Sequence, residues 1–203
     1  MNTGLIHMAL AHHYEVQPVA HISELRVDLQ FMAIPSELRD FEFSEKLDFF
    51  ALLVDARSGI SPQMIEVWQH YQDRQFPRVL LVQGIEFSES DFDDIVLIGN
   101  RVLEQFATPY LVLHDEIGEP TGLISLEDNI VHDYSGSTVT NYPAEKEMIE
   151  LIKDFQDEYT QLYKELGTEG FFQGIFAIAL PIGSSKRFGT PELNRIIESL
   201  TKH

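Results

Sequence analysis

Short runs of almost continuously apolar residues recur along the chain, and stretches with other patterns separate them. The clearest run is 47–54, and shorter ones occupy 79–82, 110–113 and 175–180. A strand that is buried on both faces of a parallel sheet has this continuous pattern. We therefore expect core strands at these four places, with 47–54 at the centre of the sheet.

Apolar residues at helical spacing lie between these runs. Ser61 precedes Pro62, an order that favours the start of a helix. The apolar residues that follow it at helical spacing are Met64, Ile65, Val67, Trp68 and Tyr71. Further helices are expected at 92–106 and 191–200. Strands that alternate with helices predict an α/β fold with a parallel sheet.

The first third of the chain and the stretch 115–169 depart from this alternation. Residues 4–11 form a mostly apolar run, and 14–22 and 26–34 have extended patterns, so we expect three strands, the last two paired as a hairpin. The stretch 115–169 begins with turn residues and contains an apolar run at 122–124. An amphipathic helix over 143–166 follows, which Gly167 is placed to end. We expect a core formed by 1–114 and 170–203 and an inserted α+β subdomain at 115–169.

Composition narrows the classes of partner and compartment. The chain has 203 residues and 44% apolar content, enough for one domain with a substantial core. Its 33 acidic residues against 14 basic ones give a net charge of −19, which argues against nucleic-acid binding and favours basic protein partners. It has no cysteine, no run near the ~20 apolar residues of a membrane span and no secretion-signal pattern. We expect a cytoplasmic protein without membrane contact.

One stretch resembles a known family. It resembles the GTPase domain of bacterial elongation factor G and its ribosome-protection relatives, and the matching residues are Val54-Asp55-Ala56-Arg57-Ser58-Gly59-Ile60-Ser61-Pro62-Gln63, Val67-Trp68 and Phe76-Pro77-Arg78. The segment 122–126 resembles the Gly-Ile-Ile-Asp of that family's inserted subdomain, and 183–189 resembles its Gly-Ser-Ala loop. The resemblance implies a P-loop-GTPase-like, mostly parallel sheet flanked by helices, with that insertion.

The groups that act on phosphate in that family are missing here. The chain contains no Gly-Lys pair, and residues 9–14, where a phosphate loop would follow the first strand, contain neither residue type. The family's Asp-Thr-Pro-Gly-His falls on 33–37, where only Pro35 remains. Phosphoryl transfer depends on these groups for positioning and electrostatics. We therefore expect the phosphate loop and first helix to be absent, no catalytic residues and no GTP hydrolysis.

Guanine recognition is a separate question. The family's Asn-Lys-Met-Asp falls on 83–86, so Gln83 and Glu86 are candidate guanine-binding residues by position, together with Ser184 and Ser185 in the Gly-Ser-Ala-like loop. The alternative is that Glu86 is a solvated loop carboxylate. Asp55 ends its strand and is expected to cap the turn at Ser58-Gly59, and Trp68 is expected to lie in the core. No bound cofactor is expected, with GTP or GDP as the alternative.

The histidines and aspartates raise the question of a metal site. His12 and His13 are adjacent, and neighbouring residues of a strand point to opposite faces, so they do not readily share one ion. Asp91, Asp93 and Asp94 precede or open a helix, where carboxylates interact favourably with its dipole. We expect no metal site.

Two binding hypotheses remain. The helix 143–166 carries Glu147, Glu150, Asp154 and Asp157 on its outer face, and the resemblance implies the ribosomal stalk protein as a partner; a solvated face is the alternative. Loss of the first helix uncovers one face of the sheet, which predicts a homodimer or cover by a rearranged N-terminal segment. An enzyme of unrelated class that uses the vacated cleft is a further alternative.

Overall fold

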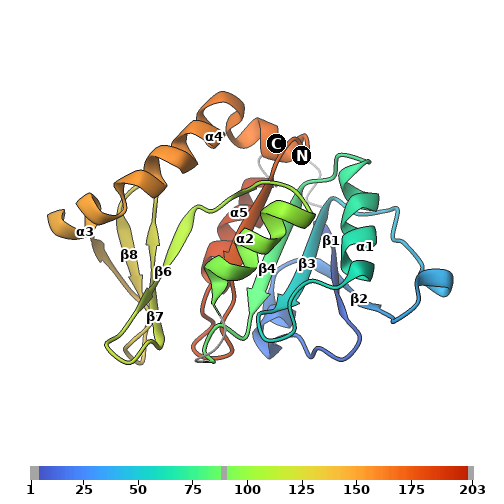
Figure 1. Ribbon diagram of the computed structural model, residues 1–203, viewed down its shortest axis with the longest axis horizontal. Coiled ribbons are helices and arrows are strands. Elements are labelled where there is room, and N and C mark those ends of the chain that lie inside the picture. The colour runs from blue at the N-terminus through green and yellow to red at the C-terminus, as the bar shows by residue number, and fades with distance from the viewer. Residues whose placement is uncertain (1–4, 88–90, 201–203) are drawn as a thin grey trace.

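A six-stranded parallel sheet forms the centre of the molecule (Figure 1). The computed structural model describes residues 5–87 and 91–200, without the side chains of residues 40, 164 and 165. The strands, in the spatial order β2-β1-β3-β4-β10-β5, are β2 (Asp28–Ile34), β1 (His7–His13), β3 (Phe49–Asp55), β4 (Arg78–Gln83), β10 (Ala177–Pro181) and β5 (Phe106–Ala107). The expected fold class, a mixed α/β fold with a helix-flanked parallel sheet, is confirmed.

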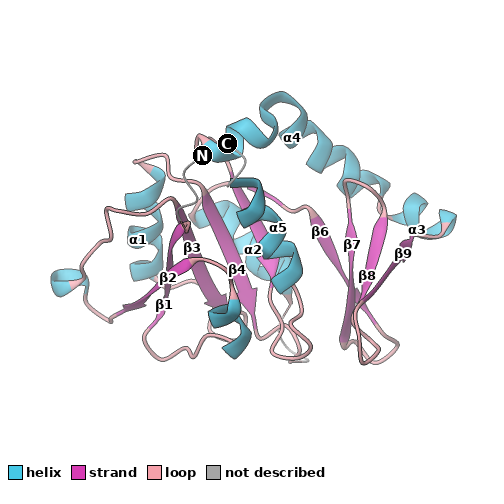
Figure 2. Cartoon of the chain, turned by 180° about the vertical axis from the view of Figure 1, so that it is seen from behind, coloured by secondary structure: helices cyan, strands magenta, loops and turns pink. Residues whose placement is uncertain are grey.

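Helices cover both faces of this sheet. Figures 1 and 2 show α1 (Pro62–Gln72) and α2 (Phe92–Val102) on one face, and α5 (Thr190–Leu200) with the 3-10 helix η1 (Ala20–Glu24) on the other. A second 3-10 turn, η2 (Leu38–Asp40), lies in the connection from β2 to β3. These positions agree with the expected helices, except that α2 ends at Val102 and not at residue 106. It ends earlier because the side chain of Asn100 accepts a hydrogen bond from the amide of Phe106, which begins β5.

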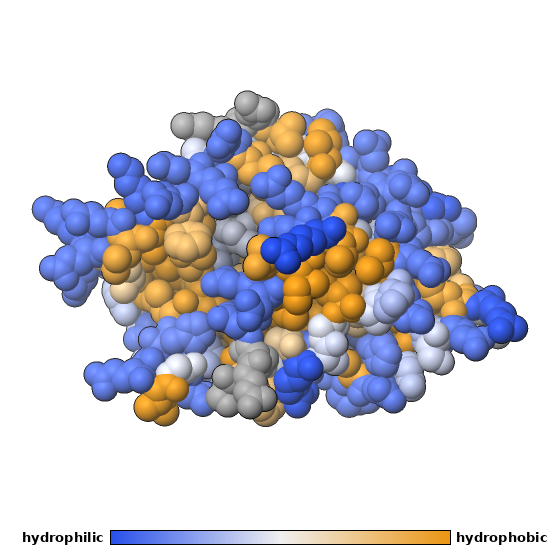
Figure 3. Space-filling view, viewed as in Figure 1, coloured by the Kyte–Doolittle hydropathy of each residue, from blue (hydrophilic) through white to orange (hydrophobic). Residues whose placement is uncertain are grey.

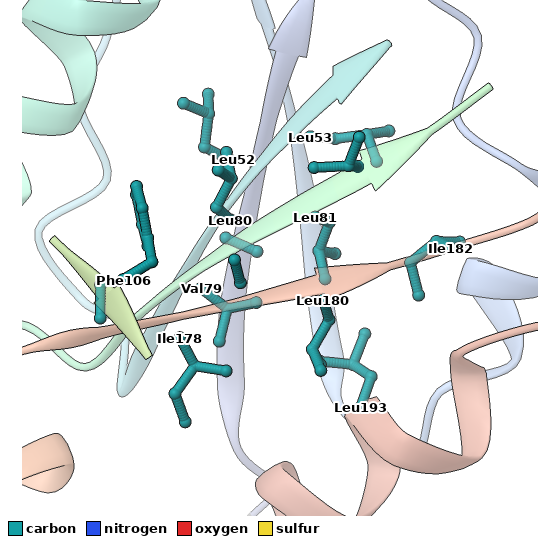
Figure 4. Packing of buried hydrophobic residues seen from close by; sticks show 14 of the residues in the cluster. Leu52, Leu53, Val79, Leu80, Leu81, Phe106, Ile178, Leu180, Ile182 and Leu193 are labelled. Atoms are coloured by element: carbon teal, nitrogen blue, oxygen red, sulfur yellow. The ribbon is translucent and has the colours of Figure 1, made fainter. Parts of the chain in front are cut away.

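The core lies where the continuous apolar runs meet. All seven residues of β3 and all six of β4 are buried. Leu53, Leu81 and Leu180 are paired in register across three neighbouring strands, and Figure 4 shows Leu193 of α5 beside this row. The core also contains Trp68, as expected; its indole donates to the carboxylate of Glu104 at 2.8 Å.

The prediction of a hairpin near the N-terminus is wrong. β2 runs parallel to β1, with His7 opposite Asp28 and His13 opposite Ile34. A parallel pair requires a crossover connection, and the chain after β1 supplies it with a turn, an extended segment and η1. Ile22 and Leu25 of this crossover are buried, which explains why the local pattern resembled a strand.

A second, antiparallel sheet stands beside the first. Its strands, in spatial order, are β6 (Tyr110–His114), β7 (Pro120–Ser125), β8 (Ile130–Asp133) and β9 (Thr140–Pro143). The run 110–113, expected as a core strand of the parallel sheet, forms β6 instead. The parallel sheet already ends with the two-residue strand β5, so the antiparallel sheet begins at Tyr110, within the segment assigned to the core.

The long helix expected over 143–166 is two helices. They are α3 (Lys146–Leu151) and α4 (Lys153–Phe172), which meet at Ile152. Gly167 has φ 55° and ψ −165°, which breaks the helical geometry at the expected place, and helical structure then continues to Phe172. Figure 1 shows α4 passing from the antiparallel sheet toward the parallel one.

Candidate functional site

Between β1 and β3 the chain changes the side of the sheet on which it adds strands. The chain adds β2 on one side of β1 and then crosses back to form β3 on the other. In open α/β sheets, ligands bind beside the carboxyl ends of the strands at such a point. A cleft of about 500 Å³ opens here, which we call the β1–β3 cleft. It is lined by residues at and after the end of β1, including His13, Glu15 and Gln17, and by residues at and after the end of β3, including Asp55, Arg57 and Ser61.

Asp55 organises the floor of this cleft. Its side chain is 4% exposed and accepts hydrogen bonds from Arg57 Nε at 2.8 Å and Arg57 Nη2 at 2.6 Å. Hydrogen bonding from Arg57 lowers the pKa of this carboxyl group, and the amide of Gln83 contributes in the same direction. The Asp55 carbonyl also accepts from the amides of Ser58 and Gly59, so the expected turn-capping role is confirmed.

Gln83 joins this arrangement from β4. Its amide nitrogen donates to Asp55 Oδ2 at 3.3 Å and to the Gln17 carbonyl at 3.0 Å, and its Oε1 accepts from Val19 N at 3.2 Å. These bonds tie the ends of β3 and β4 to the crossover after β1. Gly84 follows with φ 77°, and a Cβ there would lie 2.9 Å from Asp55 Oδ1, so the tight packing against Asp55 requires glycine.

The end of β1 does not have the form of a phosphate cradle. Residues 5–58 contain no glycine. After His13 the chain turns, with the amide of Val16 donating to the His13 carbonyl at 2.9 Å, and continues into η1. Within residues 5–87, no α-helix lies between β1 and β2. The helix N-terminus and glycine-rich loop that bind phosphates in P-loop proteins are therefore missing from this part of the chain.

Glu86 and the two serines lie at the same edge of the sheet. β4 and β10 are neighbours, with Val82 opposite Pro181, so the loops that begin after these strands are adjacent. Glu86 is partly buried, and Ser184 and Ser185 are exposed. The loop of the serines is fixed to the antiparallel sheet, because Lys186 Nζ donates to the carbonyl oxygens of Tyr134 and Ser135 at 2.7 and 2.6 Å.

The four acidic residues of the expected partner surface lie on α3 and α4. Glu147, Glu150, Asp154 and Asp157 are all exposed. Two of them are on each helix, and Ile152, whose φ and ψ are not helical, separates the two pairs.

A buried polar cluster was missed by the sequence reasoning. Glu192 of α5 is fully buried; one carboxylate oxygen hydrogen-bonds His132 Nδ1, and the other accepts from the Tyr134 hydroxyl at 2.8 Å. Arg195 is one turn further along α5, and its Nη1 lies 3.2 Å from His132 Nε2. The only local signal was a carboxylate in the first turn of an amphipathic helix, which is normally read as a dipole interaction.

Two further observations concern metal ions and membranes. Among the residues described, no three His, Cys, Asp or Glu side chains gather in a way that could hold a metal ion. In residues 5–87 and 91–200, no helix combines the length and the apolar composition that crossing a membrane requires.

The fold and the β1–β3 cleft define an α/β protein with a parallel sheet and a cleft at the point where the strand order reverses. No protein-family model matches the chain. The chain is similar to the crystal structure of a protein from Thermus thermophilus, with a TM-score of 0.67 and 14% sequence identity over 96% of this chain. The match spans 40% of the Thermus protein, and at this identity the likeness concerns the fold alone.

Proposed function

We propose that this chain is a translational-GTPase-like domain that does not hydrolyse GTP and works as a protein-binding module, with the ribosomal stalk protein as its partner. The observation that carries the proposal is the exposed acidic face of α3 and α4, formed by Glu147, Glu150, Asp154 and Asp157. Opposite charge on a partner speeds encounter and fixes orientation. The turn that follows His13 in place of a phosphate loop supports the loss of hydrolysis, because that chemistry depends on amide and lysine contacts to phosphate.

Calorimetric titration with the purified stalk protein tests this proposal. We expect saturable, salt-sensitive binding, which the Glu150→Lys/Asp154→Lys variant loses. Glu66→Lys is the matched control, since Glu66 is an exposed carboxylate on α1, a helix of the parallel-sheet core. Binding that the double variant retains, or that Glu66→Lys weakens equally, would contradict the assignment of this face.

Guanine-nucleotide binding without hydrolysis is a second candidate function. Glu86 Oε2 is buried and makes no hydrogen bond to the described residues, so a carboxylate oxygen is left for a donor such as a guanine edge. The neighbouring loop with Ser184 and Ser185 supplies further polar groups.

Titration of GDP and GTP with magnesium by calorimetry decides this second candidate. Micromolar binding that Glu86→Gln abolishes would support it. No heat up to about 1 mM nucleotide, a concentration that corresponds to roughly −4 kcal/mol, would exclude it and leave the protein-binding function.

A further inference from the structure

A groove separates α2 from α4 on the face of the molecule that α2 covers. Its volume is about 330 Å³, and it lies beside β5 and the start of β6. Its apolar lining comes from both helices and the strand, and includes Leu97, Leu111, Phe155 and Leu162. The groove is distinct from the β1–β3 cleft, with which it shares no lining residue.

Large apolar side chains are exposed along this groove. Phe155 on α4 and Leu97 on α2 line the groove and are 50% and 51% exposed. Ile98 and Val102 are further exposed apolar residues of α2, outside the groove lining. Figure 3 shows apolar side chains gathered over α2 and, in a second area, beside β6 and α4. Exposed apolar side chains beside a groove with a polar rim are typical of protein-binding sites.

The rim of the groove is acidic. Asp93 and Asp94 lie at the α2 side, and Glu158 lies at the α4 side. Burial is the main cause that raises the pKa of Asp93; repulsion by the carboxylates of Asp91 and Asp94 adds to it, and His114 acts in the opposite direction. A cation placed there relieves that repulsion. The charge of −19 over the whole chain makes a second copy of this chain a poor occupant.

We propose that the groove binds an amphipathic helix of a partner protein, with the apolar face of that helix on Leu97 and Phe155 and its lysine or arginine residues on Asp93, Asp94 and Glu158. Helices that bind in grooves use apolar anchors at i, i+3, i+4 and i+7 in this way. The surface differs from the outer carboxylates Glu150 and Asp154, so it stands whether or not the stalk protein binds.

A synthetic leucine–lysine peptide of about 14 residues, long enough for a stable helix when bound, is the probe. Fluorescence anisotropy of the labelled peptide measures its affinity for the full chain. We expect saturable binding that weakens about tenfold or more in Leu97→Ser/Phe155→Ser, because truncated apolar anchors carry much of the binding free energy. Ile117→Ser is the matched control, since Ile117 is 84% exposed in the turn between β6 and β7.

Two further comparisons separate the groove from general charge attraction. Glu158→Lys should weaken binding of the lysine peptide, and a leucine–glutamate peptide of equal length should not bind. Glu150→Lys/Asp154→Lys should leave Leu97-dependent binding in place, which distinguishes failure of this proposal from failure of the stalk-protein proposal. No binding of the lysine peptide up to about 1 mM, or unchanged affinity in Leu97→Ser/Phe155→Ser, would overturn the proposal. A dimer that this variant dissociates would assign the groove to self-association and overturn it as well.

Discussion

Asp55 and Arg57 form a close ion pair, but the two residues differ in what their removal leaves behind. The Asp55 side chain is 4% exposed and also accepts hydrogen bonds from the Gln83 amide and from the Arg57 backbone amide in the turn after β3. The Arg57 side chain is 54% exposed, and its guanidinium carbon lies 4.3 Å from the ring centroid of Phe87. A buried donor that loses its acceptor costs more free energy than an exposed charge that loses its partner.

Replacement of each partner should therefore give unequal results. Asp55→Ala should lower the free energy of unfolding by about 1–3 kcal/mol, since the Gln83 amide and the turn lose an acceptor. Arg57→Gln should lower it by about 0–1 kcal/mol, because solvent screens the half-exposed charge. Urea denaturation measures both values, and equal losses would show that the ion pair, and not the buried hydrogen bonds, stabilises this turn.

Two histidines are expected to make the free energy of unfolding depend on pH. Burial, and then the nearby Arg187, lower the pKa of His21; burial, and then Arg74, lower the pKa of His70. As pH falls below about 6.5, the ordinary value, the unfolded chain takes up these protons before the folded chain does. The free energy of unfolding should therefore decrease as pH falls through this window.

Urea denaturation at pH 7.5 and at pH 5.5 checks this prediction. His21→Gln/His70→Gln should reduce the difference between the two pH values. The lowered pKa of Asp55 acts in a separate window, because its stabilising effect is lost only as pH falls below about 4. A pH dependence that the double variant leaves unchanged would assign the effect to other groups.

At the scale of elements, one carboxylate fastens the antiparallel sheet to α5. Glu192 on α5 binds His132 on β8 and Tyr134 just after that strand. The Lys186 contacts to the carbonyls of Tyr134 and Ser135 connect the same strand end to the loop after β10. The two sheets are thus held together by polar groups in addition to apolar packing.

Loss of this carboxylate should loosen the contact between the sheets. Glu192→Ala leaves His132 and Tyr134 without their buried acceptor, and at about 1–3 kcal/mol for each unsatisfied group we expect a loss of about 2–6 kcal/mol in the free energy of unfolding. Amide hydrogen exchange should increase most in β7 and β8. Glu116→Ala, in the exposed turn between β6 and β7, is the control. Exchange in β7 and β8 that matches this control would show that apolar packing alone holds the sheets together.

At the scale of the whole molecule, the question is what covers the face of the sheet opposite α1 and α2. Within the described chain, η1 and α5 lie there, and Ile22 and Leu25 of the crossover are buried. Phe31 on the edge strand β2 is 47% exposed. Cover by the N-terminal segment therefore has a defined structural basis, and the homodimer stays a prediction.

Light scattering separates these outcomes. A mass near that of one chain, 23.3 kDa, would assign the cover to the crossover segment. A mass twice as large that Phe31→Ser reduces to one chain would assign it to a second copy, since an exposed aromatic on an edge strand is a common point of association. A dimer that Phe31→Ser does not affect would place the interface elsewhere.

Elements whose structure depends on residues close in the chain were predicted well. The buried strands β3 and β4 follow from their continuous apolar runs, and α1 begins directly after Ser61, whose hydroxyl caps it by accepting from the amide of Met64 at 3.3 Å. Patterns that fit several environments were assigned wrongly. The run 110–113 suits a strand in either sheet, and the segment 14–22 has the same alternation whether it pairs as a strand or packs as a crossover.

The sequence by itself determined the class of fold, most of the helices, the turn at Asp55 and the acidic character of α3 and α4, because burial periodicity, capping and charge are set by residues close in the chain. Only the tertiary structure decided which strands pair, that β2 runs parallel to β1, and that Glu192 meets His132 sixty positions away. It also decided that Leu97 and Phe155 line one groove. These contacts join distant segments, and the free energy that selects them comes from packing of the whole chain and not from any local pattern.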